Sequence, residues 1–252
     1  MHRIERALVA PPRAGQNTGM TTDTAPLLDC VERLTGTNPS WTVLWLHGLG
    51  ADGNDFVPIV PDLVRPGWPA LRFLFPHAPV RPITCNGGMR MRGWYDIVDL
   101  SADNLFNRAD EAGVLESVAQ VEALIAREAE RGIPPERVIL AGFSQGGAVT
   151  LATGLRRSTP LAGLVALSTY IPAMHKADAA LQPGAERQPL FIAHGRFDPV
   201  VPFMAGEQSH ALMQRLGFRT EWRQYPMQHQ VCMEEIRDLG DWMQTLFTRA
   251  TD

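Results

Sequence analysis

Lysine is almost missing from this 252-residue chain, since Lys176 is the only one and arginine supplies the rest of the positive charge. Acidic and basic residues are interspersed, 27 against 23, and the formal net charge is -4. Proteins that bind nucleic acid or anionic lipid through electrostatics need a basic patch. The sequence contains no such patch, so it predicts neither kind of partner.

Cysteine is scarce as well. Cys30, Cys85 and Cys232 lie far apart and form no Cys-x-x-Cys pair. An odd number of isolated cysteines argues against a disulfide framework and against a zinc site. We therefore expect no bound metal and a reducing compartment, which favours a cytoplasmic location.

Long apolar runs are also missing. No stretch approaches the ~20 residues that span a bilayer, and the first residues carry arginines without the continuous apolar core of a secretory signal. We expect residues 1–22 to be a disordered leader and residues 23–252 to form one domain. No internal repeat and no linker rich in proline, glycine or serine divides that domain.

Short apolar runs alternate with helical patterns along the chain. Several runs are apolar throughout, as in strands buried on both faces. Together they predict a single α/β domain with a mainly parallel sheet and helices on both faces. Strands are expected at 41–46, 71–75, 137–141, 161–168, 189–194 and 221–225. Helices are expected at 55–63, 109–131, after Ser144, at 204–216 and at 234–247. Loops are expected at 76–82 and 86–96, and an irregular surface excursion at 170–188.

The stretch Gly142-Phe143-Ser144-Gln145-Gly146 lies where a predicted strand passes into a helix. Gly-x-Ser-x-Gly at such a junction lifts a serine hydroxyl out of a sharp turn, where flanking glycines avoid collisions with neighbouring elements. The N-terminus of the helix would also stabilise an oxyanion beside the serine. An ordinary turn in which Ser144 caps the helix is the alternative, and the pentapeptide alone does not decide between them.

Asp198 and His229 each follow a predicted strand, as Ser144 does. The carboxyl ends of the strands border the site of a doubly wound sheet, so we expect these three side chains to meet. Their chain order, Ser-Asp-His, is that of the α/β-hydrolase arrangement. In it the histidine takes the serine proton and the carboxylate orients the histidine. We predict a catalytic triad of Ser144, Asp198 and His229.

Other residues compete for the two supporting roles. Asp96 and Asp178 lie outside the expected order, and Asp198 could instead cap a turn. Three other histidines compete with His229. We expect His194 in the core, His210 within a helix, and His47 beside the glycine-rich loop, whose shape it would support.

An oxyanion hole needs two convergent N–H donors. The N–H of Gln145, directly after the serine, is one candidate. The glycine-rich loop at 47–53, which follows the first predicted strand, offers the N–H of Leu49 as the second, unless the loop is a plain glycine turn. This loop is not a phosphate loop, because no lysine follows the glycines. We expect no cofactor.

The run at 46–53, Leu-His-Gly-Leu-Gly-Ala-Asp-Gly, resembles the oxyanion-loop motif of the phospholipase/carboxylesterase family. That family includes acyl-protein thioesterases and small bacterial carboxylesterases. Further motifs match in the same order at 76–79, 89–97, 142–147 and 194–202, and the similarity covers roughly 41–247. The resemblance implies an α/β-hydrolase fold without a large cap, the triad and N–H donors named above, and often a homodimer.

One departure from the family lies beside the predicted base. The family usually carries glycine before this histidine and a small residue after it, whereas Gln228 and Gln230 flank His229. Pro226 stands where a glycine is usual. The two amides could hydrogen-bond the base, narrow the pocket or alter the backbone that positions it.

Taken together, these features predict a serine hydrolase that acts on short-to-medium acyl esters or thioesters through an acyl-enzyme. We expect Met89, Trp94 and Ile171 to line the acyl pocket. Acyl transfer to an alcohol or peroxide would use the same triad. A catalytically weak acyl-binding protein, suggested by Gln228 and Gln230, is a further alternative.

Overall fold

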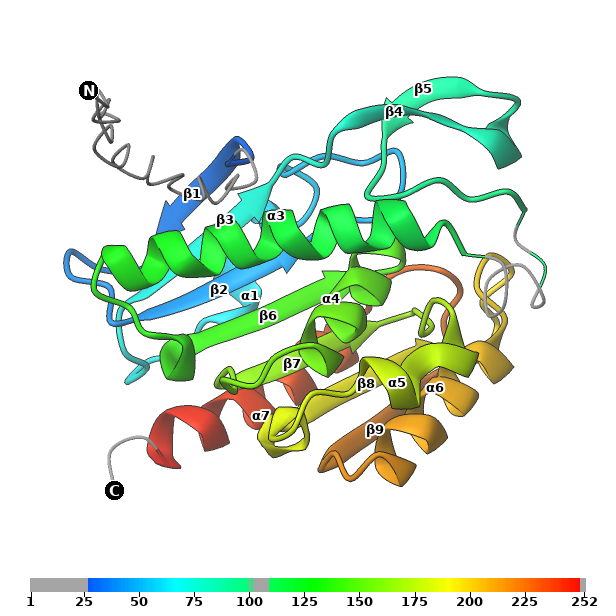
Figure 1. Ribbon diagram of the computed structural model, residues 1–252. Coiled ribbons are helices and arrows are strands. Elements are labelled where there is room, and N and C mark those ends of the chain that lie inside the picture. The colour runs from blue at the N-terminus through cyan, green and yellow to red at the C-terminus, as the bar shows by residue number, and fades with distance from the viewer. Residues whose placement is uncertain (1–26, 100, 102–108, 250–252) are drawn as a thin grey trace, which may run out of the picture.

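Seven strands form one central sheet in the computed structural model, which describes residues 27–99, 101 and 109–249 (Figure 1). Neighbouring strands run parallel except for β1, which pairs antiparallel with β3 at the edge. The expected leader at 1–22 lies outside the described residues. In spatial order the strands are β1 (Cys30–Leu34), β3 (Leu71–Pro76), β2 (Trp41–Leu46), β6 (Val138–Phe143), β7 (Gly163–Leu167), β8 (Leu190–Gly195) and β9 (Thr220–Tyr225).

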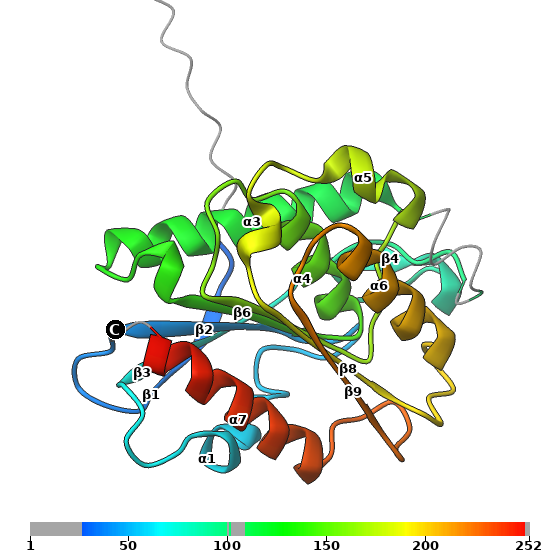
Figure 2. The same cartoon turned by 90° about the horizontal axis from the view of Figure 1, so that it is seen from below.

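Helices cover both faces of this sheet (Figure 2). One face carries α3 (Glu111–Glu130), α4 (Gln145–Leu155), the short α5 (Ala177–Ala180) and α6 (Phe203–Arg215). The other face carries α1 (Val60–Leu63) and α7 (Met233–Arg249). Among the helices that the structure describes, none has the length and apolar character that crossing a membrane requires.

The uniformly apolar strands follow from this double cover. Along β2, Leu44 packs into the core under α3 and α4, whereas its neighbour Val43 packs into the core under α7. Ile139 and Leu140 on β6 divide between the two cores in the same way. Because successive side chains of a strand point to opposite faces, a strand covered on both sides is apolar at nearly every position. The exception on β2 is Thr42, whose hydroxyl donates to the buried carboxylate of Glu128.

The predicted α/β fold is confirmed, and so are its six predicted strands and its long helices. The edge strand β1 was missed, because its sequence, Cys-Val-Glu-Arg-Leu, is only partly buried and mixes polar with apolar residues. The expected helix at 55–63 is a 3₁₀ turn, Val57–Ile59, followed by the single turn of α1. The excursion at 170–188 contains short helical turns, and its first two residues are buried.

The prediction of loops at 76–82 and 86–96 was partly wrong. β4 (Val80–Ile83) and β5 (Met89–Arg92) pair as an antiparallel hairpin outside the main sheet (Figure 1). The connection ends in Gly87 and Gly88, both at positive φ. The alternation Met-Arg-Met-Arg after two glycines is a period-two strand signal, but it is short and has no buried face.

Candidate active site

Ser144 occupies the sharp turn between β6 and α4. Its backbone lies at φ 54° and ψ -121°, a region that a residue with a side chain rarely adopts. The neighbouring glycines allow this turn, since a Cβ on Gly142 would collide with the Gly146 carbonyl, and one on Gly146 with the Leu46 carbonyl. Strain of this kind, of order 1–3 kcal/mol, presents the serine hydroxyl at the end of the sheet.

The turn is fastened by the neighbouring strand and its exit loop. Ser144 N–H donates to the Leu167 carbonyl at the end of β7 (2.9 Å), and the Thr169 hydroxyl donates to the Ser144 carbonyl (2.6 Å). A Cβ on Gly147 would press on Thr169, which explains the second glycine of the Gly146-Gly147 pair. The position of the serine hydroxyl is therefore set by packing and hydrogen bonds.

The three residues predicted as a triad meet at this end of the sheet. His229, in the loop after β9, has Nε2 2.9 Å from Ser144 Oγ and Nδ1 2.7 Å from Asp198 Oδ2. Asp198 lies in the loop after β8, and its Oδ1 accepts the N–H groups of Val200 (2.8 Å) and Val201 (2.9 Å). The carboxylate, imidazole and hydroxyl form one continuous chain of hydrogen bonds.

The Asp198 side chain has no exposed surface. Burial by itself raises the pKa of this carboxyl, but the hydrogen bond and charge of His229 and the N–H groups of Val200 and Val201 outweigh it, so the pKa is lowered. The carboxylate is therefore ionised at neutral pH. Its charge requires Nδ1 of His229 to carry the proton, which leaves Nε2 free to accept one from Ser144 Oγ.

The two predicted oxyanion donors come from adjacent parallel strands. β2 and β6 pair with Leu46 opposite Gly142, so the loops that follow them emerge side by side. Gly48 lies against Ser144, because a Cβ there would be 3.5 Å from the serine Cβ. Within the described residues, neither Leu49 N–H nor Gln145 N–H donates a hydrogen bond to another protein group. Both donors are free for a ligand.

A cavity of about 310 Å³ opens over Ser144 and His229. Its lining is mostly apolar, and Asp55 is the one carboxylate among the lining residues. The sequence prediction missed most of the residues that line it, although Val200 and Val201 lie only two and three residues after Asp198 and could have been found from that position. The lining residues are Gly48, Leu49, Ala51, Asp55, Ile97, Phe143, Ser144, Gln145, Tyr170, Val200, Val201 and His229.

The predicted pocket residues Met89, Trp94 and Ile171 do not line this cavity, which corrects the sequence prediction. Met89 lies on the β4–β5 hairpin and is 64% exposed. Trp94 is fully buried behind the Leu49 loop, where its indole N–H donates to the His47 carbonyl (2.9 Å). Ile171 is buried in the core. Apolar character alone could not distinguish a pocket wall from a packed core.

None of the competing carboxylates or histidines lies in the cavity lining. Asp96 accepts hydrogen bonds from Thr84, and Asp178 pairs with Arg215 on the surface. The three competing histidines have structural contacts: His210 stacks on Trp222, His47 accepts from Ala78 N–H (3.1 Å), and His194 contacts the Val201 carbonyl (2.9 Å). Burial lowers the pKa of both His47 and His194, which keeps them neutral.

The glutamines beside the base are both exposed, and neither lines the cavity. Gln230 N–H donates to the Gln228 carbonyl (3.0 Å), which tightens the loop that carries His229. A Cβ on Gly195 would collide with that same carbonyl, so the loop packs against the end of β8. The departure from the usual glycine therefore leaves the hydrogen bonds of His229 intact.

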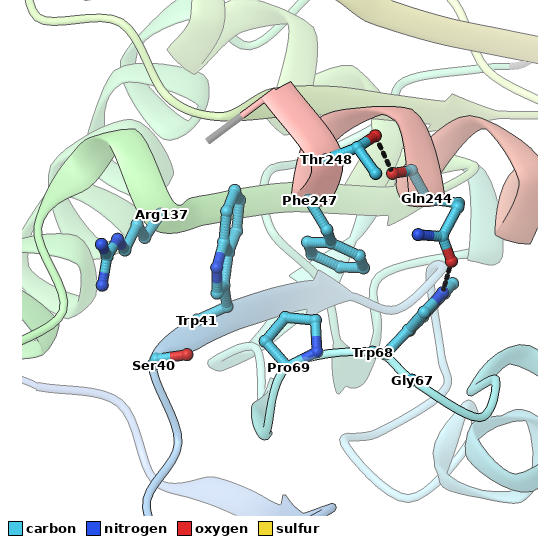
Figure 3. A pocket seen from close by; sticks show the side chains of 9 residues that line it. All are labelled: Ser40, Trp41, Gly67, Trp68, Pro69, Arg137, Gln244, Phe247 and Thr248. Atoms are coloured by element: carbon cyan, nitrogen blue, oxygen red, sulfur yellow. Dashed lines mark hydrogen bonds between the residues drawn. The ribbon is translucent and has the colours of Figure 1, made fainter. Parts of the chain in front are cut away.

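A larger cavity, about 420 Å³, lies at the opposite end of the strands, beside the start of β2 (Figure 3). Trp41 at the start of β2 stands between Arg137 and Phe247, and Trp68 donates to Gln244 (2.7 Å). Its lining contains no histidine, cysteine or carboxylate, so no general base stands beside its two hydroxyl residues, Ser40 and Thr248. In the described part of the chain, no three histidine, cysteine or acidic side chains gather as a metal site.

Comparison with known proteins agrees with this geometry. The family model described as Phospholipase/Carboxylesterase matches residues 35–247. Acyl-protein thioesterase 1 of Neurospora crassa is 39% identical over 84% of this chain and 89% of its own length. A probable carboxylesterase of Oryza sativa subsp. japonica is 38% identical over 80% of this chain and 76% of its own length. The crystal structure of Arabidopsis thaliana SOBER1 covers 82% of this chain and 98% of its own, with a TM-score of 0.76 and 33% identity. The chain therefore belongs to the phospholipase/carboxylesterase family and is a serine hydrolase of the α/β-hydrolase fold.

Proposed function

We propose that Ser144, His229 and Asp198 hydrolyse carboxylic esters or thioesters by way of an acyl-enzyme. Ser144 Oγ attacks the carbonyl carbon while His229 Nε2 takes the hydroxyl proton, and the N–H groups of Leu49 and Gln145 bind the oxyanion. The imidazolium then gives its proton to the leaving alkoxide or thiolate. Water, deprotonated by His229, attacks the acyl carbon and releases the carboxylic acid and Ser144.

One observation supports this proposal above the others. His229 Nδ1–H donates to Asp198 Oδ2 (2.7 Å), the Ser144 hydroxyl donates to His229 Nε2 (2.9 Å), and this chain of hydrogen bonds ends in an apolar cavity. These lengths lie within the range expected of an activated nucleophile and its base. The two free N–H groups beside Ser144 complete what acyl transfer requires.

The size and charge of the cavity suggest the class of substrate. A volume of about 310 Å³ stands at the small end of the range for ligand pockets, which favours short-to-medium acyl groups. Asp55 places a carboxylate in the lining, and within the described residues it has no ion-pair partner. We propose that neutral or cationic leaving groups are preferred over strongly anionic ones.

Replacing Ser144 by alanine tests the proposal. Hydrolysis of p-nitrophenyl butyrate should fall more than about a thousandfold, because triad residues act as a unit. Ser158→Ala changes an exposed serine beyond the far end of α4 and should keep wild-type activity. Hydrolysis by Ser144→Ala within tenfold of the wild type would contradict the proposal.

A fluorophosphonate probe separates the enzyme from an acyl-binding relative of the fold. The probe should label the wild type and leave Ser144→Ala unlabelled, whereas a protein that only binds acyl chains would not react. Product analysis in the presence of a competing alcohol measures the ratio of acyl transfer to the alcohol and hydrolysis by water. No feature of the described residues favours transfer.

Cellular location and assembly remain predictions. We propose a cytoplasmic location, supported by three cysteines that are all free thiols. A homodimer is expected from the family resemblance, and sedimentation equilibrium of the purified chain would test it.

A further inference from the structure

Residues 92–95, which connect β5 to the rest of the chain, lie between the two loops that carry the oxyanion donors. We call this stretch the bridging segment. It contacts the Leu49 loop on one side and the start of α4 on the other. These contacts are hydrogen bonds to backbone groups, together with close packing of Gly93 against Leu49.

On the α4 side, the contact is the side chain of Gln145. Gln145 is 1% exposed. Its Oε1 accepts the Trp94 backbone N–H (2.8 Å), and its Nε2 donates to the Tyr95 carbonyl (2.7 Å). The amide therefore fixes the backbone of two consecutive residues of the bridging segment, while the backbone N–H of Gln145 itself is a proposed oxyanion donor.

On the other side, the bridging segment fixes the Leu49 loop at two points. The Trp94 indole donates to the His47 carbonyl (2.9 Å), and the Arg92 carbonyl accepts the Gly50 N–H (2.8 Å). His47 and Gly50 bracket Leu49 in the chain. Gly93 also packs tightly against Leu49, because a Cβ on Gly93 would lie 3.0 Å from a Leu49 methyl carbon.

We propose that the side chain of Gln145 is a positioning residue that aligns the two oxyanion donors with each other through the bridging segment. The inference rests on the proposed function of the Leu49 and Gln145 N–H groups. The donors belong to different loops, and a hydrogen bond weakens steeply when its angle or length departs from the optimum. A rigid link between the loops holds both donors where the oxyanion will form.

The test uses substitutions that remove hydrogen bonds but keep bulk. Gln145→Met retains the backbone N–H and leaves the Trp94 N–H and Tyr95 carbonyl without their partner. Gln188→Met is the matched control, because Gln188 is also fully buried, accepts from Leu161 N–H and donates to the Gly154 carbonyl. It lies away from the cavity.

Gln145→Met should lower kcat for p-nitrophenyl butyrate about tenfold to a hundredfold, less than the 10²–10³ lost with a whole oxyanion donor. KM should change less than threefold. Affinity for a trifluoromethyl ketone, whose adduct with Ser144 places an oxyanion in the hole, should fall by the same factor as kcat/KM. Gln188→Met should leave kcat and ketone affinity within twofold of the wild type.

A second pair of variants examines the other half of the link. Trp94→Phe removes the indole N–H that reaches His47 and should lower kcat about threefold to tenfold, since one of the two fixing points remains. Trp68→Phe removes an indole hydrogen bond to Gln244 at the remote cavity and should not change kcat. If the kcat of Trp94→Phe equals that of Trp68→Phe, the bridging segment does not align the two oxyanion donors.

Hydrogen exchange provides a measurement that does not depend on catalysis. The amides at 47–51 should exchange several-fold faster in Gln145→Met than in the wild type, with no such change in Gln188→Met. Unchanged exchange at 47–51 in Gln145→Met, or a rise in KM with no fall in kcat, would overturn the inference. Failure of the proposed function would look different, since wild-type hydrolysis would then survive Ser144→Ala.

Discussion

Replacing Asp198 by asparagine tests whether this carboxylate makes Ser144 reactive by orienting His229. The structure decides how the new amide must lie. Oδ1 accepts two N–H groups, from Val200 and Val201, so the asparagine oxygen has to stay there. Its NH₂ group then occupies the place of Oδ2 and faces His229 Nδ1, which must become an acceptor.

The consequence is a change of tautomer. With Nδ1 unprotonated, the neutral imidazole carries its proton on Nε2, 2.9 Å from Ser144 Oγ, and can no longer accept the proton of the hydroxyl. A wrong tautomer of this kind in a Ser-His-Asp triad lowers kcat about 10⁴-fold. At 1.36 kcal/mol per decade that is about 5 kcal/mol of transition-state stabilisation. KM should change little, because Asp198 does not line the cavity.

The assay is steady-state hydrolysis of p-nitrophenyl butyrate at pH 7.5, with the rate of fluorophosphonate labelling as a second readout. Both should fall by a similar factor. Asp178→Asn is the matched control, since its carboxylate pairs with Arg215 on the surface, and it should retain full activity. A loss in Asp198→Asn of less than tenfold would refute the assigned role, provided that the variant melts within a few degrees of the wild type.

The buried carboxyl of Glu235 and the exposed carboxyl of Asp55, at the cavity, lead to further predictions. Glu235 is fully buried with no hydrogen-bond partner of good geometry, and burial, reinforced by Asp238 and only partly offset by the nearby Cys232 N–H, raises its pKa to about 8. The unfolded chain releases this proton from about pH 4.5 upward, so Glu235 costs stability as the pH rises towards 8, by at most about 1.4 kcal/mol per pH unit. In urea unfolding, the free energy of unfolding of Glu235→Gln should rise relative to that of the wild type between pH 5 and pH 8. An equal difference between the two proteins at both pH values would contradict this. At the cavity, Asp55→Asn should raise kcat/KM for a butyryl-coenzyme A thioester relative to p-nitrophenyl butyrate about threefold, as expected for one charge removed about 6 Å away in high dielectric. The gain should shrink in 1 M salt, and an unchanged ratio at low salt would count against a role for Asp55 in leaving-group choice.

Local sequence patterns were enough to predict most of the sheet. The residues of β6 are all apolar, and those of β2 are apolar except for Thr42. Cover on both faces of the sheet accounts for that pattern. The pattern is weak for β1 and for the β4–β5 hairpin, which have no fully buried face. Edge strands are held by pairing with a neighbour, and pairing leaves little trace in composition.

The pocket residues show the same limit in another form. Trp94 is large, apolar and close in sequence to other motif residues, yet it packs behind the Leu49 loop and not in the cavity. Tyr170, expected in a surface excursion, is buried and lines the cavity. Whether an apolar side chain faces a cavity or a core depends on the packing of distant elements.

By itself, the sequence determined the family, the α/β architecture and the order of the three residues proposed for catalysis. These follow from local patterns: a strand, a glycine-flanked serine, and polar residues just past strand ends. Only the tertiary structure decided that Asp198 Oδ1 is held by two backbone N–H groups, that the glutamines beside His229 face solvent, and that Gln145 reaches across to the bridging segment. Such contacts join residues that are distant in the chain, and their geometry is set by how the loops pack at the end of the sheet.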